Sequence, residues 1–133
     1  MVSVLNPYLV FDGNAREAME YYRDVLGGEL NINTFGEFGQ SGATADKVMH
    51  ARLKSDAGVI MASDTAPGMA YEPGRNFSIS LSGENADELR GYWNGLSKSG
   101  TVTMPLEKQI WGDEFGACVD RFGISWMVNI NSR

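Results

Sequence analysis

The chain has 133 residues, 43% of them hydrophobic, which is enough for a globular domain with a substantial core. Its 17 acidic and 11 basic side chains give a formal net charge of −6, so nucleic acid is not expected as a partner. A single cysteine, Cys118, excludes an internal disulfide and a cysteine-based zinc site. No apolar run is long enough for a membrane helix and no signal-peptide pattern is present, so we expect a cytoplasmic protein without a membrane partner.

The first half of the chain predicts one helix among four strands. A strand is expected in "VLNPYLVF", where Pro7 favours an edge or near-terminal position. The segment "AREAMEYYRDVLGG" has apolar residues three or four apart and ends in two glycines, which predicts an amphipathic helix. Strands follow in "ELNINTFGEF" and on both sides of a hairpin turn at residues 55–58.

The second half repeats this order of elements. "NFSISLSG" predicts a strand, "ENADELRGYWNGLSKSG" a helix, and "TVTMPLEKQ", "EFGACVD" and "ISWMVNI" three further strands. We therefore predict an α+β fold, a single domain over 1–133 built from tandem βαβββ modules at about 1–66 and 75–133. Segments 36–46 and 64–75 are rich in Gly, Pro and Ser and are expected to be loops or lids.

Alternation along the strands separates two faces. The face expected to pack on the helices carries Leu9, Phe11, Met49, Ala51, Leu53, Ile60, Ala62, Phe77, Ile79, Leu81, Trp126, Val128 and Ile130. The opposite face carries Asn6, Tyr8, His50, Arg52, Met61, Ser63, Ser78, Ser80, Ser125, Met127 and Asn129. This second mixture of small polar, thioether, imidazole and guanidinium groups is typical of a concave ligand site, although an antiparallel sheet can also leave one face in water.

The motifs "EAMEYYRDVLGGEL" and "DRFGISWMVNI", within paired βαβββ modules, resemble the vicinal oxygen chelate superfamily of glyoxalases, bleomycin and fosfomycin resistance proteins and extradiol dioxygenases. "PYLVFDGNAREAMEYY", "MASD" and "PLEKQIWGDEFGACVDRFGISWMVNI" resemble its PhnB-like branch, also labelled demethylubiquinone methyltransferases. The resemblance covers nearly the whole chain. It implies that the sheets of the two modules close around a cleft and that the protein is a homodimer.

The resemblance also implies where a metal would bind. Metal-dependent members place a His or Glu on the first and last strand of each module, which corresponds here to Asn6, Met61, Ser78 and Met127. None of these side chains suits a hard divalent cation, and His50 lies on a different strand. We therefore expect no metal and no cofactor.

Five further predictions concern single side chains. His50 is either a structural histidine or a ligand-facing acid, base or anion contact acting with Arg52. Arg52 either binds a carboxylate or phosphonate-like group or pairs with an internal carboxylate such as Asp113. In "KQIWGDEFG", Trp111 and Phe115 are expected to cap the cleft with Asp113 as a polar handle, unless an aromatic side chain only packs.

These features favour a metal-free small-molecule-binding protein of the PhnB-like branch, with an unidentified ligand. The alternatives are a vicinal oxygen chelate enzyme, such as a glyoxalase-type lyase or isomerase, and a drug-sequestering resistance protein, so an enzymatic activity stays open. A methyltransferase of the common type is disfavoured, because the chain lacks the doubly wound domain and the Gly-rich turn that bind S-adenosylmethionine.

Overall fold

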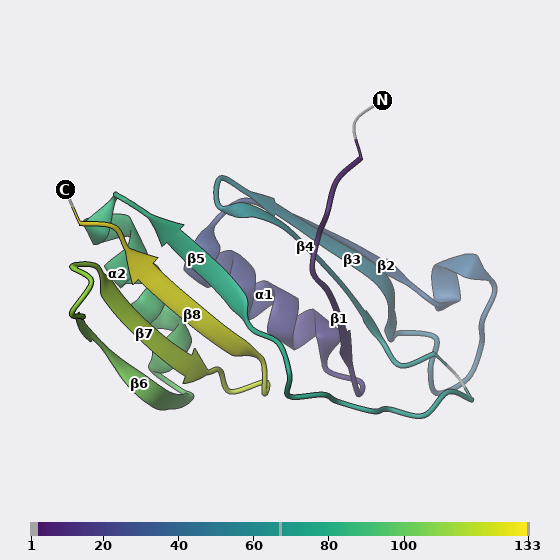
Figure 1. The fold of residues 1–133 in the computed structure, drawn as a ribbon. Coiled ribbons are helices and arrows are strands. Elements are labelled where there is room, and N and C mark those ends of the chain that lie inside the picture. Colours follow the sequence, from purple (N-terminus) through teal and green to yellow (C-terminus); the bar gives the residue numbers. More distant parts are fainter. Residues whose placement is uncertain (1–2, 67, 133) are drawn as a thin grey trace. The chain divides into compact units, whose positions relative to one another are not determined.

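A computed structural model describes residues 3–66 and 68–132. The chain divides into two compact units, Met1–Pro73 (unit 1) and Gly74–Arg133 (unit 2), and each is described by itself (Figure 1). Unit 1 contains β1 (Tyr8–Phe11), α1 (Ala15–Leu26), β2 (Glu29–Thr34), the short 3₁₀ helix η1 (Gly36–Phe38), β3 (Val48–Ser55) and β4 (Gly58–Asp64). Unit 2 contains β5 (Ile79–Gly83), α2 (Ala86–Ser97), β6 (Thr101–Lys108), β7 (Glu114–Val119) and β8 (Ser125–Ile130).

The two units share one sheet topology. The strand order is β1-β4-β3-β2 in unit 1 and β5-β8-β7-β6 in unit 2. In each sheet the first strand runs parallel to the last, and the remaining neighbours are antiparallel. Both sheets are open, with β1 and β2 or β5 and β6 at the edges. The predicted α+β fold with repeated βαβββ order is therefore confirmed, whereas the joining of both units into one domain stays a prediction.

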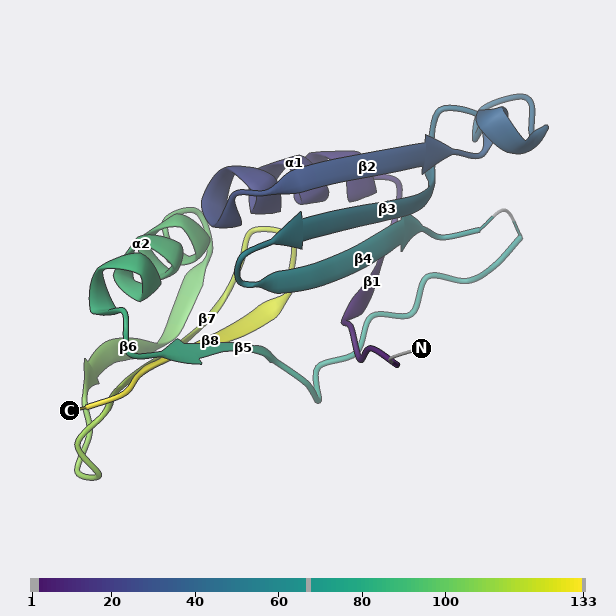
Figure 2. The same cartoon turned by 90° about the horizontal axis from the view of Figure 1, so that it is seen from above.

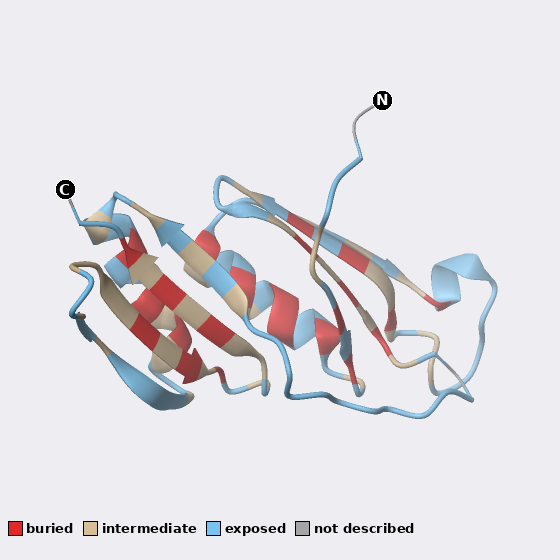
Figure 3. Cartoon of the chain, viewed as in Figure 1, coloured by how far each residue is buried: buried red, intermediate tan, exposed pale blue. Residues whose placement is uncertain are grey.

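In unit 1, α1 covers one face of the sheet across β2, β3 and β4 (Figure 2). Its buried residues recur every three or four positions, and the strands of the sheet bury alternate positions (Figure 3). This core comprises Leu9, Phe11, Ala15, Ala18, Met19, Tyr22, Leu26, Val48, Ala51, Leu53, Ile60 and Ala62. Burial of these apolar side chains is the main force that holds α1 on the sheet.

In unit 2, α2 packs in the same way on β5, β7 and β8. Leu89, Trp93 and Leu96 form the buried side of the helix, and Cys118, Trp126, Val128 and Ile130 form the buried side of the sheet. Gly116 on β7 provides room for this packing, because a Cβ atom there would come within 2.9 Å of the Trp93 ring. None of the helices in the part of the chain described is long and apolar enough to cross a membrane.

Two predicted core positions are wrong. Met49 was expected on the helix side, but the pairing between β2 and β3 shifts at Asn33 and Thr34, so that Val48 is 1% exposed and Met49 is only partly buried. Such a bulge adds one residue to a strand and reverses the alternation beyond it. Phe77 lies before β5 instead of within it and is exposed, because the strand begins only at Ile79.

Candidate functional site

The face of the unit 1 sheet that is remote from α1 brings several predicted site residues together; we call it the open face. The burial pattern of β1 alternates between exposed and buried, which places Tyr8 on the open face while Leu9 and Phe11 enter the core. Strand register then sets its neighbours: Tyr8 lies opposite Met61, Met61 opposite Arg52, and Arg52 opposite Asn31. These four residues form one row across all four strands of unit 1.

A second row lies one pleat further along the same strands. Asn33 is paired with His50, and Val10 is paired with Ser63. The His50 ring is partly buried and lies 5.9 Å from the Tyr8 ring between centroids, at an angle of 35°. Tyr8 itself is 49% exposed, so its ring is available for contact with a further molecule.

Asn6, the remaining predicted site residue of unit 1, lies before β1 and outside the strand pairing. It is partly buried, and the next residue, Pro7, accepts a hydrogen bond from the Met61 amide at 3.0 Å. This bond extends the contact between the two strands by one residue toward Asn6.

Unit 2 gathers a separate group of predicted site residues on the sheet face remote from α2. Met127 lies opposite Ser80 and Ala117, and Asn129 lies opposite Phe115. Ser78 is exposed and precedes β5. The predicted site residues therefore fall into two groups, one in each unit, and the predicted cleft that would combine the groups stays a prediction.

Asp113 is held inside unit 2, in the hairpin between β6 and β7. Its carboxylate accepts hydrogen bonds from the Asn129 side chain at 3.0 Å and from the Ser132 amide at 2.8 Å. These donors, Asn129 first, lower the pKa of the Asp113 carboxyl below its ordinary value. The carboxylate thus fastens the hairpin to β8 and to Ser132 after it. The predicted pairing of Arg52 with Asp113 would join different units and stays a prediction.

The two aromatic residues of this hairpin lie together. The rings of Trp111 and Phe115 are 6.3 Å apart between centroids and inclined by 59°, so they form a tilted aromatic contact. Trp111 is 59% exposed, whereas Phe115 is partly buried on β7. Phe115 therefore packs within unit 2, and Trp111 retains a free ring surface.

The residues at the four positions implied for a metal do not fit a divalent cation. Asn6, Met61, Ser78 and Met127 offer two thioethers, an amide and a hydroxyl, and none of these is an anionic or imidazole ligand. Among residues 3–66 and 68–132, no three His, Cys, Asp or Glu side chains are grouped as a metal ion would require. Cys118 is buried, and burial raises the pKa of its thiol to about 11, so this thiol is suited to packing and not to thiolate chemistry.

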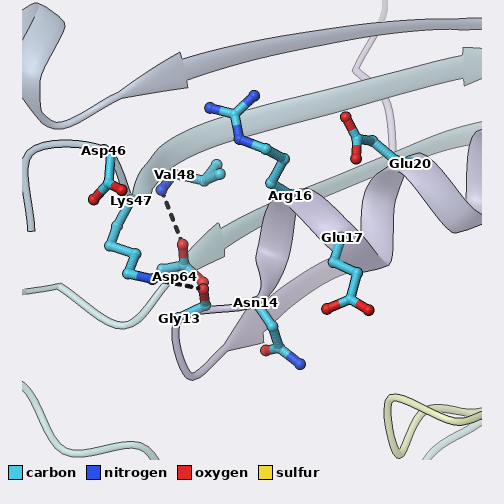
Figure 4. A pocket seen from close by; sticks show the side chains of 9 residues that line it. All are labelled: Gly13, Asn14, Arg16, Glu17, Glu20, Asp46, Lys47, Val48 and Asp64. Carbon is cyan, nitrogen blue, oxygen red and sulfur yellow. Dashed lines mark hydrogen bonds between the residues drawn. The ribbon is translucent and has the colours of Figure 1, made fainter.

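A hollow on the other side of unit 1 was missed by sequence reasoning. It encloses about 270 Å³ between the first turns of α1 and the start of β3, with Asp64 and Val48 among its lining residues (Figure 4). The buried Asp64 carboxylate accepts hydrogen bonds from the Ala15 and Val48 amides, both at 2.9 Å. Its donors lie 49 and 16 residues away in sequence, so no local pattern indicates this role.

A second buried acid, Asp120, holds the turn between β7 and β8. Its carboxylate accepts hydrogen bonds from the Phe122 amide at 2.8 Å, the Ile124 amide at 3.1 Å and the Trp126 indole at 2.8 Å. Asp120 was not among the predicted site residues. Both buried acids are fully engaged by backbone or indole donors, so we assign them to structure and not to ligand binding.

Comparison with known proteins identifies relatives over the full length. The family model described as 3-demethylubiquinone-9 3-methyltransferase matches residues 3–129. Protein YjdN of Escherichia coli is 31% identical over 140 aligned residues, which cover 95% of this chain and 94% of that protein. The crystal structure of protein PA1353 from Pseudomonas aeruginosa superposes with a TM-score of 0.89 at 40% identity, covering 99% of this chain and 100% of PA1353.

More distant structures share the fold. A putative 3-demethylubiquinone-9 3-methyltransferase, the PhnB protein from Bacillus cereus, has a TM-score of 0.76 at 21% identity and covers 97% of this chain and 100% of its own. A glyoxylase/bleomycin resistance protein/dioxygenase domain from Frankia has a TM-score of 0.68 at 16% identity and covers 100% of this chain and 94% of its own. The chain therefore belongs to the family described as 3-demethylubiquinone-9 3-methyltransferase, and it shares the fold of the glyoxalase/bleomycin resistance/dioxygenase structures.

Proposed function

We propose that this chain is a metal-free small-molecule-binding protein and that the open face of unit 1 contacts its ligand. The observation that carries the proposal is the row of Tyr8, Met61, Arg52 and Asn31, which places an aromatic ring, a thioether, a guanidinium and an amide side by side. Ligand sites commonly combine apolar surface with a few polar groups that fix orientation. The half-exposed tyrosine beside the partly buried methionine supplies the apolar surface that such a ligand would contact.

The family description names a methyltransferase, but the fold does not supply the site that such enzymes usually have. The common S-adenosylmethionine fold is a doubly wound parallel sheet with a Gly-rich turn after its first strand. Here each sheet is mixed, with only its first strand parallel to its neighbour, and the turn from β1 to α1 is Asp12-Gly13-Asn14. We therefore do not propose this activity.

An acid–base enzyme is the second candidate, and the position of His50 favours it. The ring of this histidine lies on the open face beside Tyr8 and two residues from Arg52, where it would meet the same ligand. If turnover of a bound compound is found, His50→Gln should abolish it, whereas binding should only be weakened by the loss of the ring contact. Equal turnover by the variant would exclude His50 as the acid or base.

The homodimer implied by the superfamily is also a proposal. Strand β6 is an edge of its sheet and exposes Val102 and Met104, which a second copy would cover. Sedimentation velocity at micromolar concentration should show a species of twice the 14.5 kDa chain mass. A single species of the chain mass would refute the dimer.

The test of the main proposal begins with protein purified without an affinity tag or chelator. Elemental analysis by mass spectrometry should find far less than one equivalent of Zn, Ni, Mn or Fe. A library of small anions, neutral molecules and cations should then raise the unfolding temperature of the chelator-treated protein for at least one class of compound. Stoichiometric metal, or the absence of any stabilising compound, would contradict the proposal.

A further inference from the structure

The open face of unit 1 is divided into an apolar half and a polar half. Strands β1 and β4 contribute Tyr8, Val10, Val59 and Met61 to it, together with Ser63. Strand β3 contributes His50, Arg52 and Lys54, and β2 contributes Asn33, Asn31 and Glu29 opposite them. A ligand that satisfies both halves must be amphipathic, with its apolar part over β1 and β4 and its polar part over β3.

The charges of the polar half select an anion. The charged strand residues of this face are Glu29, Arg52 and Lys54. The face therefore carries two cations and one carboxylate, although the net charge of the chain is −6. Lys54 is paired with Glu29, whereas Arg52 lies between Asn31 and Met61. Within the described part of unit 1, no ion pair involves Arg52. Its planar guanidinium is therefore available to hold a carboxylate through two parallel hydrogen bonds.

The dimensions of the apolar half limit the ligand to a small molecule. Neighbouring strands are about 4.8 Å apart, so Tyr8 on β1 and Arg52 on β3 are separated by roughly 10 Å with Met61 between them. A single ring joined to a carboxylate fits this span, whereas a long hydrocarbon chain would pass beyond the edge strand β1. Thioether sulfur and aromatic rings make favourable contacts with a further aromatic ring, and Met61, Tyr8 and His50 provide them.

We propose that the open face of unit 1 binds a small aromatic carboxylate, with the carboxylate on Arg52 and the ring over Met61 beside Tyr8 and His50. This inference rests on the proposed small-molecule-binding function and adds the ligand class and its orientation. It opposes the drug-sequestering alternative with a cationic ligand, because the strand residues of this face carry an excess of positive charge in spite of the acidic chain.

Isothermal titration calorimetry with three matched probes tests the ligand class. Benzoate carries the ring and the charge, benzamide keeps the ring without the charge, and cyclohexanecarboxylate keeps the charge without the aromatic ring. Benzoate should bind at millimolar or lower concentration, benzamide at least about ten-fold more weakly, and cyclohexanecarboxylate several-fold more weakly. No benzoate binding, or equal binding of benzoate and benzamide, would overturn the inference.

Two variants of the same strand and face test the assigned residue. Arg52→Gln should weaken benzoate binding by about ten-fold or more, because a charge-assisted pair is lost, while Lys54→Gln, which removes the cation opposite Glu29, should change it less than about two-fold. Both positions are exposed, and circular dichroism should confirm that both variants fold. Equal effects of the two substitutions, or none, would overturn the assignment of Arg52.

The outcomes separate this inference from the proposed function. If the screen yields ligands that are neutral or cationic and insensitive to Arg52→Gln, the aromatic acid is excluded while small-molecule binding stands. If neither the probes nor any library compound binds, both proposals fall.

Discussion

Asp64 in unit 1 and Ile130 in unit 2 occupy equivalent positions but have different structural roles. Each ends the last strand of its sheet, is paired with the final residue of the first strand, and is 4% exposed. In unit 1 the carboxylate of Asp64 accepts the amide of Ala15, the first residue of α1. In unit 2 the side chain of Asn85 accepts the Glu88 amide instead, so α2 is capped locally and Ile130 can serve the core.

The hairpins between the last two strands also differ, and here the buried carboxylate belongs to unit 2. In unit 1, Ser55 is paired with Gly58, and the short turn needs only bonds to the Ser55 hydroxyl. In unit 2, Val119 is paired with Ser125, and the longer turn is organised by the buried Asp120. Each unit therefore buries one carboxylate where backbone amides would otherwise lack partners. The same sheet topology thus permits this carboxylate to lie at the helix start in one unit and at the hairpin turn in the other.

The largest expected effect concerns a glycine that both units require at the same place. A Cβ atom on Gly28, after α1, would lie 2.2 Å from the Lys54 carbonyl oxygen, and one on Gly100, after α2, would lie 2.1 Å from that of Val119. Alanine at either position should destabilise the protein by about 3 kcal/mol or more, and Gly28 should suffer more because its φ is +104°. Urea unfolding followed by far-ultraviolet circular dichroism measures both changes.

Gly91 is the matched control, because it lies within α2 and a Cβ atom there would meet nothing within 4 Å. Gly91→Ala should stabilise the protein by roughly 0.5–1 kcal/mol through helix propensity. A small loss of stability from alanine at Gly28 and Gly100 would contradict the close packing of the residues after each helix against β3 and β7.

The next effect distinguishes the two helix starts. Asp64→Ala leaves the buried amides of Ala15 and Val48 without their acceptor and should cost about 3 kcal/mol. Asn14→Ala is the control, because the Asn14 side chain makes no capping bond and its loss should cost less than about 0.5 kcal/mol. If Asn14→Ala proved as damaging as Asp64→Ala, the Asn14 side chain would cap α1 in solution, contrary to the structure.

A smaller effect is expected at the cap of α2. Asn85→Ala removes one local acceptor and should cost about 1 kcal/mol, well below the effect of Asp64→Ala. Tryptophan emission during urea unfolding reports this change, since Trp93, Trp111 and Trp126 all lie in unit 2. A loss as large as that of Asp64→Ala would mean that the two units do not differ in how their helices begin.

The smallest effect is pH-dependent and restricted to unit 2. The pKa of Asp113 is lowered in the folded state, so its contribution to stability is present above the ordinary carboxyl pKa of about 4 and is lost as the pH falls through the folded-state value. Asp113→Asn should therefore flatten the acid side of the stability profile and leave its slope near neutral pH unchanged. An unchanged acid side would show that the bonds to Asn129 and Ser132 do not persist in solution.

Sequence periodicity predicted both α-helices and the eight strands of the described residues, because both helices are amphipathic and most strands bury alternate residues. The 3₁₀ helix η1 was not predicted, since Gly36–Phe38 stood at the end of the expected strand "ELNINTFGEF" and in a segment expected to be a loop. The exceptions depend on partners elsewhere in the chain. The bulge that buries Val48 instead of Met49 depends on pairing with β2, which a strand's own sequence does not encode. Asp64 resembles an ordinary strand-end residue until its donors, far away in sequence, are brought to it.

Only part of the candidate site could be predicted from the sequence, for a similar reason. Alternation was sufficient to place Tyr8, Arg52 and Met61 on one face, since strand parity is local and register follows from hairpin geometry. Asp113 was expected to be a polar handle, but its bonds to Asn129 and Ser132 depend on how the hairpin meets the end of β8 and the residues after it. Contacts of this kind lie beyond the reach of periodicity.

The central claim is that the open face of unit 1 binds a small anionic molecule without a metal. Nuclear magnetic resonance mapping of amide shifts, with benzoate titrated into the chelator-treated ¹⁵N-labelled protein, tests it most directly. We predict saturable shifts centred on Tyr8, Arg52 and Met61, with the same affinity after addition of Zn²⁺. Shifts confined to other parts of the chain, shifts that require the metal, or no shifts at all would contradict the claim.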